Sequence, residues 1–433
     1  MRVQHLLILI WVLVLVRLIW PGAVPVAYGA GLMGLYVLAS LARLRRQTQI
    51  LCAVLAAVTL ALAAAYDGWQ AIILAADGAT VFAAFFGTIM ILRATADRRP
   101  ETALARQAFT HFDRGQQSGA FLVASHLIGA LLVVGVMAVL APIQDKDASD
   151  VERRTAAEVC QRGMCLAPLW SPFWIAMAVA FQHLPSVPLW QIMVLGLPMA
   201  VGGLLLSHVM FARGVRLADL GRAVLALSPI VLPVALCAAL ITLLTGFTDL
   251  STIQAVAVSV PPLCLLGLMV LGRGAVQSAA GSAYLGIGKV GDEIVLLTVA
   301  LCLGRVLEQV LAEIGVIEWI AALNPPALSL IALTVVGMTV AALVGIHQVV
   351  SMTVMLVLLV PLQSGLSDLV LLESALVGWA FSSMIGVSAV SVAMAGAMFR
   401  VPLEQLVIGP NLKFVAAYGV AAIVVLGAVN RIM

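Results

Sequence analysis

Histidines and small polar residues interrupt otherwise apolar segments at a few places in this chain. An imidazole can donate to a carboxylate or titrate near neutral pH, and a serine hydroxyl can hydrogen-bond a ligand or cap a broken helix. Proline interrupts helical hydrogen bonding and frees a backbone carbonyl group. We therefore predict a binding site for a small substrate or an ion, made from Ser125, His126, Ser171, Pro172, Gly345, His347, Gln348, Ser351, Ser382, Ser383, Gly386 and Ser388.

The predicted site residues fall into two sets that follow the same order along the chain. Each set begins with a histidine at the expected tip of an apolar hairpin and continues with an apolar segment that is broken by Pro, Ser or Gly. A VPLxQ pentapeptide and a closing apolar segment follow. Self-similarity in a fixed order indicates an internal duplication. The matching features are His126 with His347, the break at Ser171 with the break at Ser382, and Val187–Gln191 with Val401–Gln405.

Structural explanations of the same residues stay open at this point. A membrane histidine can be satisfied by a backbone carbonyl inside a helix, and serines and glycines also serve close helix packing. Arg305 and Glu308 are spaced to pair on one helix face. Asp77 is expected to mark a kink exposed to water, and Glu373 is expected to be solvated near the outer boundary of the membrane.

The elements that carry these residues follow from composition. Hydrophobic residues make up 63% of the chain and charged residues 10%, with a mean hydropathy of +1.14. Soluble domains carry about 25% charged residues, so a water-facing shell cannot cover this chain. Apolar runs long enough to span a bilayer core of about 30 Å recur throughout, and they are apolar all round rather than alternating as barrel strands do. The sequence predicts an all-α integral membrane protein.

Other classes of site receive little support from the sequence. The six cysteines are scattered and form no CxxC pair, so we expect neither a metal site nor a disulfide framework. We expect no resident cofactor, with Na⁺ or H⁺ as the coupling ion. The net charge of +3 comes without a basic patch interleaved with aromatic residues, so nucleic acid is not an expected partner.

Lys and Arg residues orient the apolar segments, because cytoplasmic loops are enriched in them. This rule places the N-terminus in the cytoplasm and requires the basic residues on both flanks of 118–142 to lie inside. The segment 118–142 is therefore interpreted as a re-entrant hairpin, and the same reasoning makes 328–362 re-entrant from the outside. The prediction is eleven transmembrane helices and two hairpins, with polar connections at 96–117, 143–163 and 273–291.

An odd number of crossings separates the two copies, so they are expected to have opposite orientations in the membrane. The predicted parts are an N-terminal helix over 1–22, a first repeat over 23–212 with a hairpin at 118–142 and a broken helix at 164–183, and a second repeat over 213–433 with a hairpin at 328–362 and a broken helix at 370–399. Irregular backbone at membrane depth is tolerated where it lines a polar cavity. The hairpins and broken helices are therefore expected to form the moving part of an alternating-access transporter.

This order of elements resembles the ion transporter superfamily, which includes divalent anion/sodium symporters, citrate–metal transporters, arsenite-permease relatives and the large membrane subunit of TRAP transporters. The resemblance covers about residues 23–430. Ser125-His126 and Gly345–Gln348 stand where the sodium/dicarboxylate branch carries a Ser-Asn-Thr signature. The resemblance implies elevator transport, a homodimer, and carboxylate substrates that move with Na⁺ or H⁺.

The sequence thus predicts a secondary active transporter of a small mono- or dicarboxylate in the bacterial inner membrane. Its expected partners are the small-molecule anion, the lipid bilayer and a second copy of the chain. Three alternatives stay open: a TRAP-like large subunit, an efflux permease for a metalloid or inorganic anion, and a multi-pass membrane enzyme. The enzyme is disfavoured, because the loops expected outside the membrane are short and carry few catalytic candidates.

Overall fold

A computed structural model of the chain describes residues 3–100, 114–132, 135–141, 147–211, 221, 224–225, 228–362 and 364–433. Several basic residues that oriented the apolar segments, Arg106, Lys146, Arg213, Arg216 and Arg222, lie outside these residues. Parts of the predicted hairpin at 118–142 and of the connections at 96–117 and 143–163 also lie outside them.

All regular elements among the described residues are helices, which confirms the prediction of an all-α membrane protein. Within the described part of the chain, eight segments are long and apolar enough to cross a membrane: Val26–Arg43, Arg46–Ala65, Trp69–Ala96, Leu189–Phe211, Thr252–Met269, Gly291–Glu313, Asp368–Phe399 and Leu403–Ile432.

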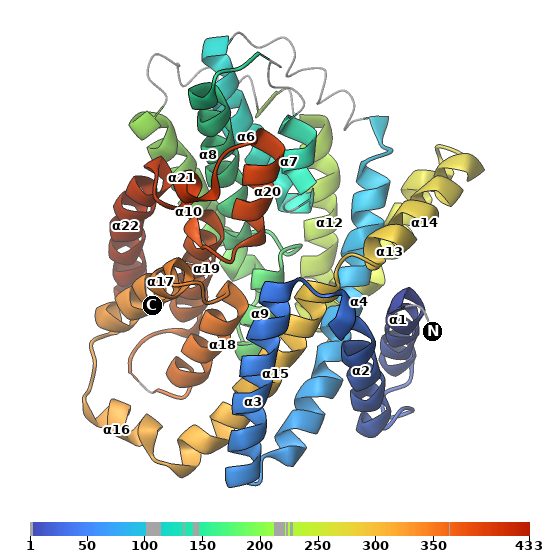
Figure 1. The fold of residues 1–433 in the computed structure, drawn as a ribbon, viewed down its shortest axis with the longest axis vertical. Coiled ribbons are helices and arrows are strands. Elements are labelled where there is room, and N and C mark those ends of the chain that lie inside the picture. The colour runs from blue at the N-terminus through green and yellow to red at the C-terminus, as the bar shows by residue number, and fades with distance from the viewer. Residues whose placement is uncertain are drawn as a thin grey trace. The chain divides into compact units, whose positions relative to one another are not determined.

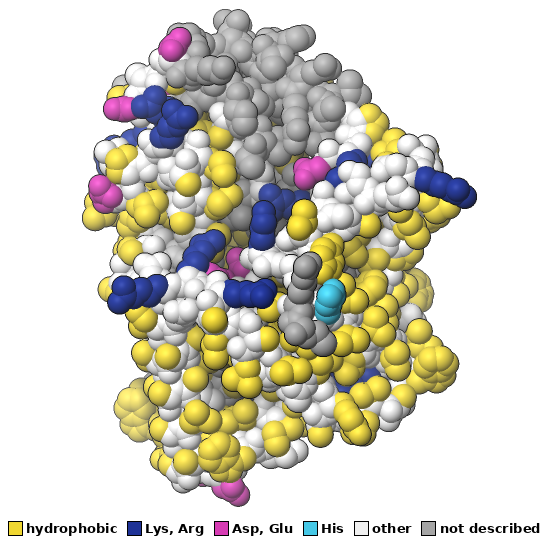
Figure 2. Space-filling view, turned by 45° about the vertical axis from the view of Figure 1, so that its right-hand side comes forward, with side chains coloured by type: hydrophobic (Ala, Val, Ile, Leu, Met, Phe, Trp, Pro, Cys, Tyr) yellow, Lys and Arg dark blue, Asp and Glu magenta, His cyan; other side chains and the backbone are white. Residues whose placement is uncertain are grey.

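The surface of the described residues is suited to lipid. Figure 2 shows hydrophobic side chains over much of the lower part of the molecule in that view, while most of the visible Lys, Arg, Asp and Glu side chains lie across its middle and upper part. Large apolar side chains that a water-soluble protein would bury stand exposed along the helices, among them Leu38 at 68%, Val194 at 65% and Val420 at 66%. Extended apolar surfaces of this kind mark contact with a membrane.

The chain divides into two compact units, and both halves of the sequence contribute to each of them. Unit 1 contains Met1–Arg98, Thr248–Asn324 and Val357–Leu362, and unit 2 contains Arg99–Phe247, Pro325–Leu356 and Gln363–Met433. Both predicted broken helices fall within unit 2. The division into inverted repeats stays a prediction.

Unit 1 is organised around α4 (Trp69–Ala96), whose 28 residues exceed the length that a hydrocarbon core of about 30 Å requires. The helices that pack against it are α1 (Val3–Ile19), α2 (Val26–Ser40), α13 (Thr252–Met269), α14 (Arg273–Ile287) and α15 (Gly291–Glu313). Against α15 pack α3 (Arg46–Ala65) and the short α16 (Val316–Ala322).

Two expectations for unit 1 are wrong. Asp77 does not mark a water-exposed kink, because α1 brings Arg17 beside α4 and the two side chains pair at 2.7 Å. Gly29 of α2 leaves the room that this pair needs, since a Cβ there would lie 1.9 Å from an Asp77 carboxylate oxygen. The stretch 273–291 is largely helical rather than a loop, and Arg98 bonds two serine hydroxyls of α14, on Ser278 and Ser282.

In unit 2, α17 (Ala327–Leu343) runs parallel to α19 (Asp368–Ile385), and the two helices lie side by side (Figure 1). Met338 of α17 packs against Gly378, and four residues later Ala342 accepts a hydrogen bond from the backbone of Val387, just after α19. Because α17 and α19 run in the same direction, the chain between them must make a return to the end at which α17 began. The helix α18 (Gln348–Leu359) supplies it.

The first half of the chain repeats this path in unit 2. Leu122 and Ser125 of α6 (Arg114–Leu132) approach Gly163 of α8 (Asp150–Cys165), and Gly129 approaches Met164 further along both helices. The helices α6 and α8 therefore run parallel as well, and α7 (Gly135–Leu140) packs on α6 within the return between them. The helices α6 and α7 lie largely within the range predicted for the first hairpin, and α17 and α18 lie largely within the range predicted for the second. That these ranges form re-entrant hairpins in a bilayer stays a prediction.

The predicted connection at 143–163 is wrong, because most of it belongs to α8. Ser149 and Glu152 form a capping box that starts this helix at Asp150, and Ala156 to Cys165 are buried. The first broken helix therefore begins near 150, not at 164. The polar residues Glu158, Gln161 and Arg162 are among its buried residues, so the buried part of the helix does not stand out as an apolar run.

Candidate functional site

Two broken helices cross the core of unit 2. The first consists of α8 and α9 (Ile175–His183), which are separated by residues 166–174 with a single 3-10 turn, η3 (Ala167–Leu169). The second consists of α19 and α20 (Val390–Phe399), which are separated by residues 386–389. The first half of each helix packs against the second half of the other, α8 on α20 and α19 on α9 (Figure 1). The two helices therefore run past each other in opposite directions.

The breaks carry the predicted serines, and these serines tie each break to its hairpin. Ser171 donates to the carbonyl oxygen of Ala130 in α6 at 2.6 Å. Ser382 donates to the carbonyl oxygen of Met338 in α17 at 3.0 Å. Ser171 and Ser382, which the sequence comparison matched with each other, thus make the same kind of contact in space.

Two neighbours complete these junctions. Pro172 is buried beside Ser171 in the first break. At the second break, Gly386 allows the chain to turn against α17, because a Cβ there would lie 2.3 Å from the Ser382 carbonyl oxygen and 3.2 Å from Ala342.

His126 lies inside α6, not at the tip of the hairpin as the sequence suggested. Its Nδ1 faces the Gly163 carbonyl oxygen at 3.0 Å, and its Nε2 faces the indole N–H of Trp170 at 3.0 Å. A carbonyl only accepts and an indole only donates, so these partners assign the hydrogen to Nδ1 and the lone pair to Nε2. Both ring nitrogens are used within the protein. This arrangement matches the structural explanation of a satisfied histidine.

His347 does lie at a hairpin turn, between α17 and α18. Gly345 adopts a φ of +91° in this turn, a conformation that residues with a Cβ rarely adopt. The imidazole Nδ1 accepts from the backbone N–H of Val349 at 3.3 Å. Gln348 and Ser351 follow in the first turn of α18 and are mostly buried. His126 and His347 therefore occupy different places in their respective hairpins.

The remaining predicted residues differ in their surroundings. Ser125 donates to the Leu122 carbonyl one turn earlier in α6. Ser383 is buried, its hydroxyl has no hydrogen-bond partner among the described residues, and its carbonyl oxygen accepts from Ser391 of α20. Ser388 is half-buried within the second break. Cys165, at the end of α8, hydrogen-bonds with the same Ser391, so the start of one break meets the end of the other.

Arg162 is a buried cation that sequence reasoning assigned to a loop. It is 1% exposed in the last turn of α8. Its Nε donates to Ser207 of α10 (Leu189–Phe211) at 2.9 Å, and its Nη1 donates to Asn411 of α22 (Pro410–Ile432) at 2.6 Å. The guanidinium also lies 4.2 Å from the ring centroid of Phe211. The capping box at Ser149 was the signal in the sequence that residues after 150 are helical.

The other charged residues noted within apolar segments differ in their exposure. Arg305 and Glu308 pair at 2.9 Å, as their spacing predicts, on an exposed face of α15. Glu373 is fully buried, so the expectation that it is solvated is wrong. The reason is that α19 lies in the core of unit 2 and every one of its residues from Leu369 to Ile385 is buried.

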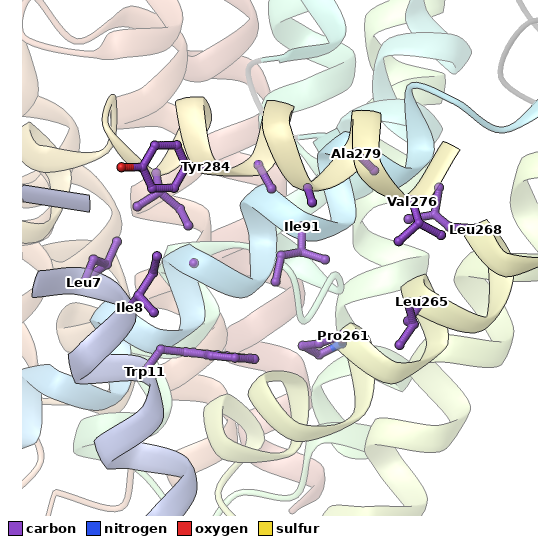
Figure 3. Close-up of a pocket in the computed structure, with 14 residues that line it drawn as sticks. Leu7, Ile8, Trp11, Ile91, Pro261, Leu265, Leu268, Val276, Ala279 and Tyr284 are labelled. Carbon is purple, nitrogen blue, oxygen red and sulfur yellow. The ribbon is translucent and has the colours of Figure 1, made fainter. Parts of the chain in front are cut away.

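Unit 1 contains a cavity of about 390 Å³ between α1, α4, α13 and α14 (Figure 3). Its wall is apolar, with Trp11 and Tyr284 the largest side chains and no charged residue. None of the predicted site residues lines it. A cavity of this composition suits hydrocarbon and lacks the polar groups that orient an anion.

The fold is similar to the crystal structure of the YdaH transporter of Alcanivorax borkumensis, which was reported to have an unusual topology. The TM-score is 0.56 at 15% sequence identity, and the match covers 89% of this chain and 98% of that chain. No protein-family model matches the sequence, and no curated protein matches it by sequence. The chain is therefore a multi-pass α-helical membrane protein that shares the fold of a transporter.

Proposed function

We propose that the chain is a secondary active transporter of a small organic anion, a mono- or dicarboxylate, in the bacterial inner membrane. The observation that carries this proposal is the pair of broken helices, which pass each other in opposite directions within unit 2. Discontinuous helices of this kind form the substrate and ion sites of secondary transporters. The likeness in fold to a transporter supports the same reading.

The half-helices α9 and α20 provide the chemistry for an anion. Both begin at a break, and neither has a side chain that caps its N-terminus, where Trp174 and Ala389 stand. The N–H groups of a first helical turn and the positive dipole end of a helix favour negative charge. The buried Arg162, near the end of α8, adds a fixed positive charge close to the first break. The transported anion would bind between the two breaks.

We infer an elevator mechanism, and the composition of unit 2 supports it, because this unit contains both broken helices and most of both predicted hairpins. In this proposal unit 2 moves with its substrate while unit 1 stays fixed, and the chain works as a homodimer with its N-terminus in the cytoplasm. Coupling to an ion gradient, Na⁺ or H⁺, drives the movement.

Reconstitution tests the proposal directly. Purified full-length protein in proteoliposomes is expected to accumulate at least one labelled carboxylate from a panel of mono- and dicarboxylates when a Na⁺ or H⁺ gradient is imposed. Accumulation should disappear when both gradients are collapsed by ionophores. The absence of gradient-dependent flux for every anion in the panel would refute the proposed function.

A further inference from the structure

Glu373 lies in the second turn of α19 and is 0% exposed. Neither of its carboxyl oxygens has a hydrogen-bond partner, and no Lys, Arg or His pairs with it in the part of the chain that the structure describes. An ionised carboxylate in such a place loses its hydration without compensation, at a cost of several kcal/mol. A buried acid in this state is expected to hold a proton or a cation.

A backbone carbonyl oxygen lies near the carboxyl group of Glu373. A Cβ built on Gly196 of α10 would lie 3.1 Å from Glu373 Oε1 and 1.8 Å from the carbonyl oxygen of Leu169 in the first break. The carboxyl group therefore lies close to a backbone acceptor. Two acceptors beside each other are compatible when a proton on the carboxyl group supplies the donor.

The elements packed against α19 offer little charge to stabilise an ionised Glu373. The helices α17 and α20 and the turn η3 carry no charged or titratable side chain. In α10 the one such residue is His208, twelve positions beyond Gly196, which is about 18 Å along the helix. The residues of this kind on the other packed elements are Asp150, Glu152, Arg153, Arg154, Glu158, Cys160, Arg162 and Cys165 of α8, His183 of α9, Glu404 of α21 (Leu403–Val407), and Lys413, Tyr418 and Arg431 of α22.

Of all these groups, Tyr418 of α22 is the one that interacts electrostatically with Glu373. Its hydroxyl donates to the Met199 carbonyl of α10 at 2.7 Å, so its hydrogen is already engaged. Arg162 bonds residues of the same two helices further along, at Ser207 of α10 and Asn411 of α22, and the carboxylate with which it interacts electrostatically is that of Glu158 in its own helix. In the described structure Glu373 thus lies near a backbone carbonyl acceptor, and its two carboxyl oxygens have no hydrogen-bond partner.

We propose that Glu373 is the proton-binding residue of the transporter, protonated in the state described here. This inference rests on the proposed function and selects H⁺ over Na⁺ as the coupling ion. The carboxylate takes up one proton when unit 2 faces the side of higher proton activity, and it returns that proton to water on the other side. No bond other than the O–H bond forms or breaks. Because an ionised Glu373 is costly in its buried position, the crossing step is favoured only when the proton is bound.

The proton site can be tested without knowing the substrate. Infrared spectra of the full-length protein in lipid nanodiscs at neutral pH are expected to show the carbonyl stretch of a protonated carboxylic acid. This band should be lost in Glu373→Gln, shifted in Glu373→Asp and unchanged in Glu308→Gln, a control at an exposed acid. A wild-type spectrum without the band, or a band that survives in Glu373→Gln, overturns the proposal.

Transport then tests the coupling. With an anion that the wild type accumulates, Glu373→Gln is expected to lose accumulation driven by a pH gradient, while exchange of labelled for unlabelled anion across equal pH persists. Accumulation by Glu373→Gln at the wild-type level would overturn the proposal. If even the wild type moves no anion, the proposed function fails, and the infrared spectra still decide whether Glu373 holds a proton.

Discussion

His126 is fixed by two partners of opposite kind, a carbonyl oxygen at Nδ1 and an indole N–H at Nε2. A side chain that replaces it must both donate and accept to keep Gly163 and Trp170 satisfied. Glutamine has that capacity, whereas leucine has none. Substitutions that keep or remove these two contacts can therefore distinguish a structural histidine from one that binds the ligand.

We expect His126→Leu to leave two buried polar groups without partners, at about 1–3 kcal/mol each. The apparent melting temperature of the purified protein should fall by several degrees, as followed by tryptophan fluorescence. His126→Gln should recover most of the loss and retain substrate exchange. If the leucine variant melts like the wild type but loses exchange, His126 acts on the substrate instead.

At the scale of single residues, the sequence predicts which residues interrupt the apolar segments, but it does not predict what surrounds each side chain. Ser171 and Ser382 were predicted from the pattern of breaks, and both bond their hairpins. Arg162 was misplaced, because its partner Asn411 lies 249 residues further along the chain and nothing local reveals the pairing. Whether Glu373 is solvated or buried likewise depends on which helices surround α19.

At the scale of elements, Gly163 sets how closely α8 approaches α6. A Cβ at this position would lie 2.0 Å from the Ser125 hydroxyl and 2.3 Å from the Leu122 carbonyl oxygen. The hydroxyl can rotate away, but the backbone oxygen cannot move without the helix. The contact between these two helices therefore depends on glycine.

Gly163→Ala is expected to cost about 1–3 kcal/mol, typical of overpacking in a close contact, and to lower the apparent melting temperature. Gly202→Ala in α10 is the matched control, since no heavy atom lies within 4 Å of its Cβ position. That control should melt at or slightly above the wild-type temperature. Equal behaviour of the two variants would show that α6 and α8 are not in close contact.

The positions of helices can be predicted from the sequence where an apolar run ends in residues that interrupt a helix. The second hairpin, with its turn at Gly345, and the break between α19 and α20 fall within their predicted ranges. The helix α8 was missed because hydropathy detects contact with lipid, and this helix is covered by protein instead. The first hairpin was predicted from charge, and α6 begins at Arg114, before the expected boundary at 118.

At the scale of the whole molecule, the predicted topology places residues before α6 and residues before α8 on the same side of the membrane. Single cysteines at Asp97 and Asp150, both exposed positions, are therefore expected to react with an impermeant maleimide from the cytoplasmic side of oriented vesicles. A cysteine at Glu318, in α16, should react from the opposite side. The native cysteines are buried or half-buried, which keeps the background low.

Labelling of Asp97→Cys and Asp150→Cys from different sides would contradict the prediction. The chain between them would then cross the membrane, and the first hairpin would not be re-entrant. Charge counting along the sequence led to this topology, and the parallel course of α6 and α8 agrees with it. The labelling experiment can decide the orientation independently of both.

The bond between Arg162 and Asn411 has a consequence for biosynthesis. A ribosome adding about 5–20 residues per second needs on the order of ten seconds to a minute to make the 249 residues that separate them. During that interval α8 has been made, but the helix that satisfies its guanidinium has not. The nascent chain must keep Arg162 in water, among lipid headgroups or against an insertion factor until α22 emerges. Unit 2 therefore matures only after α22 has been made.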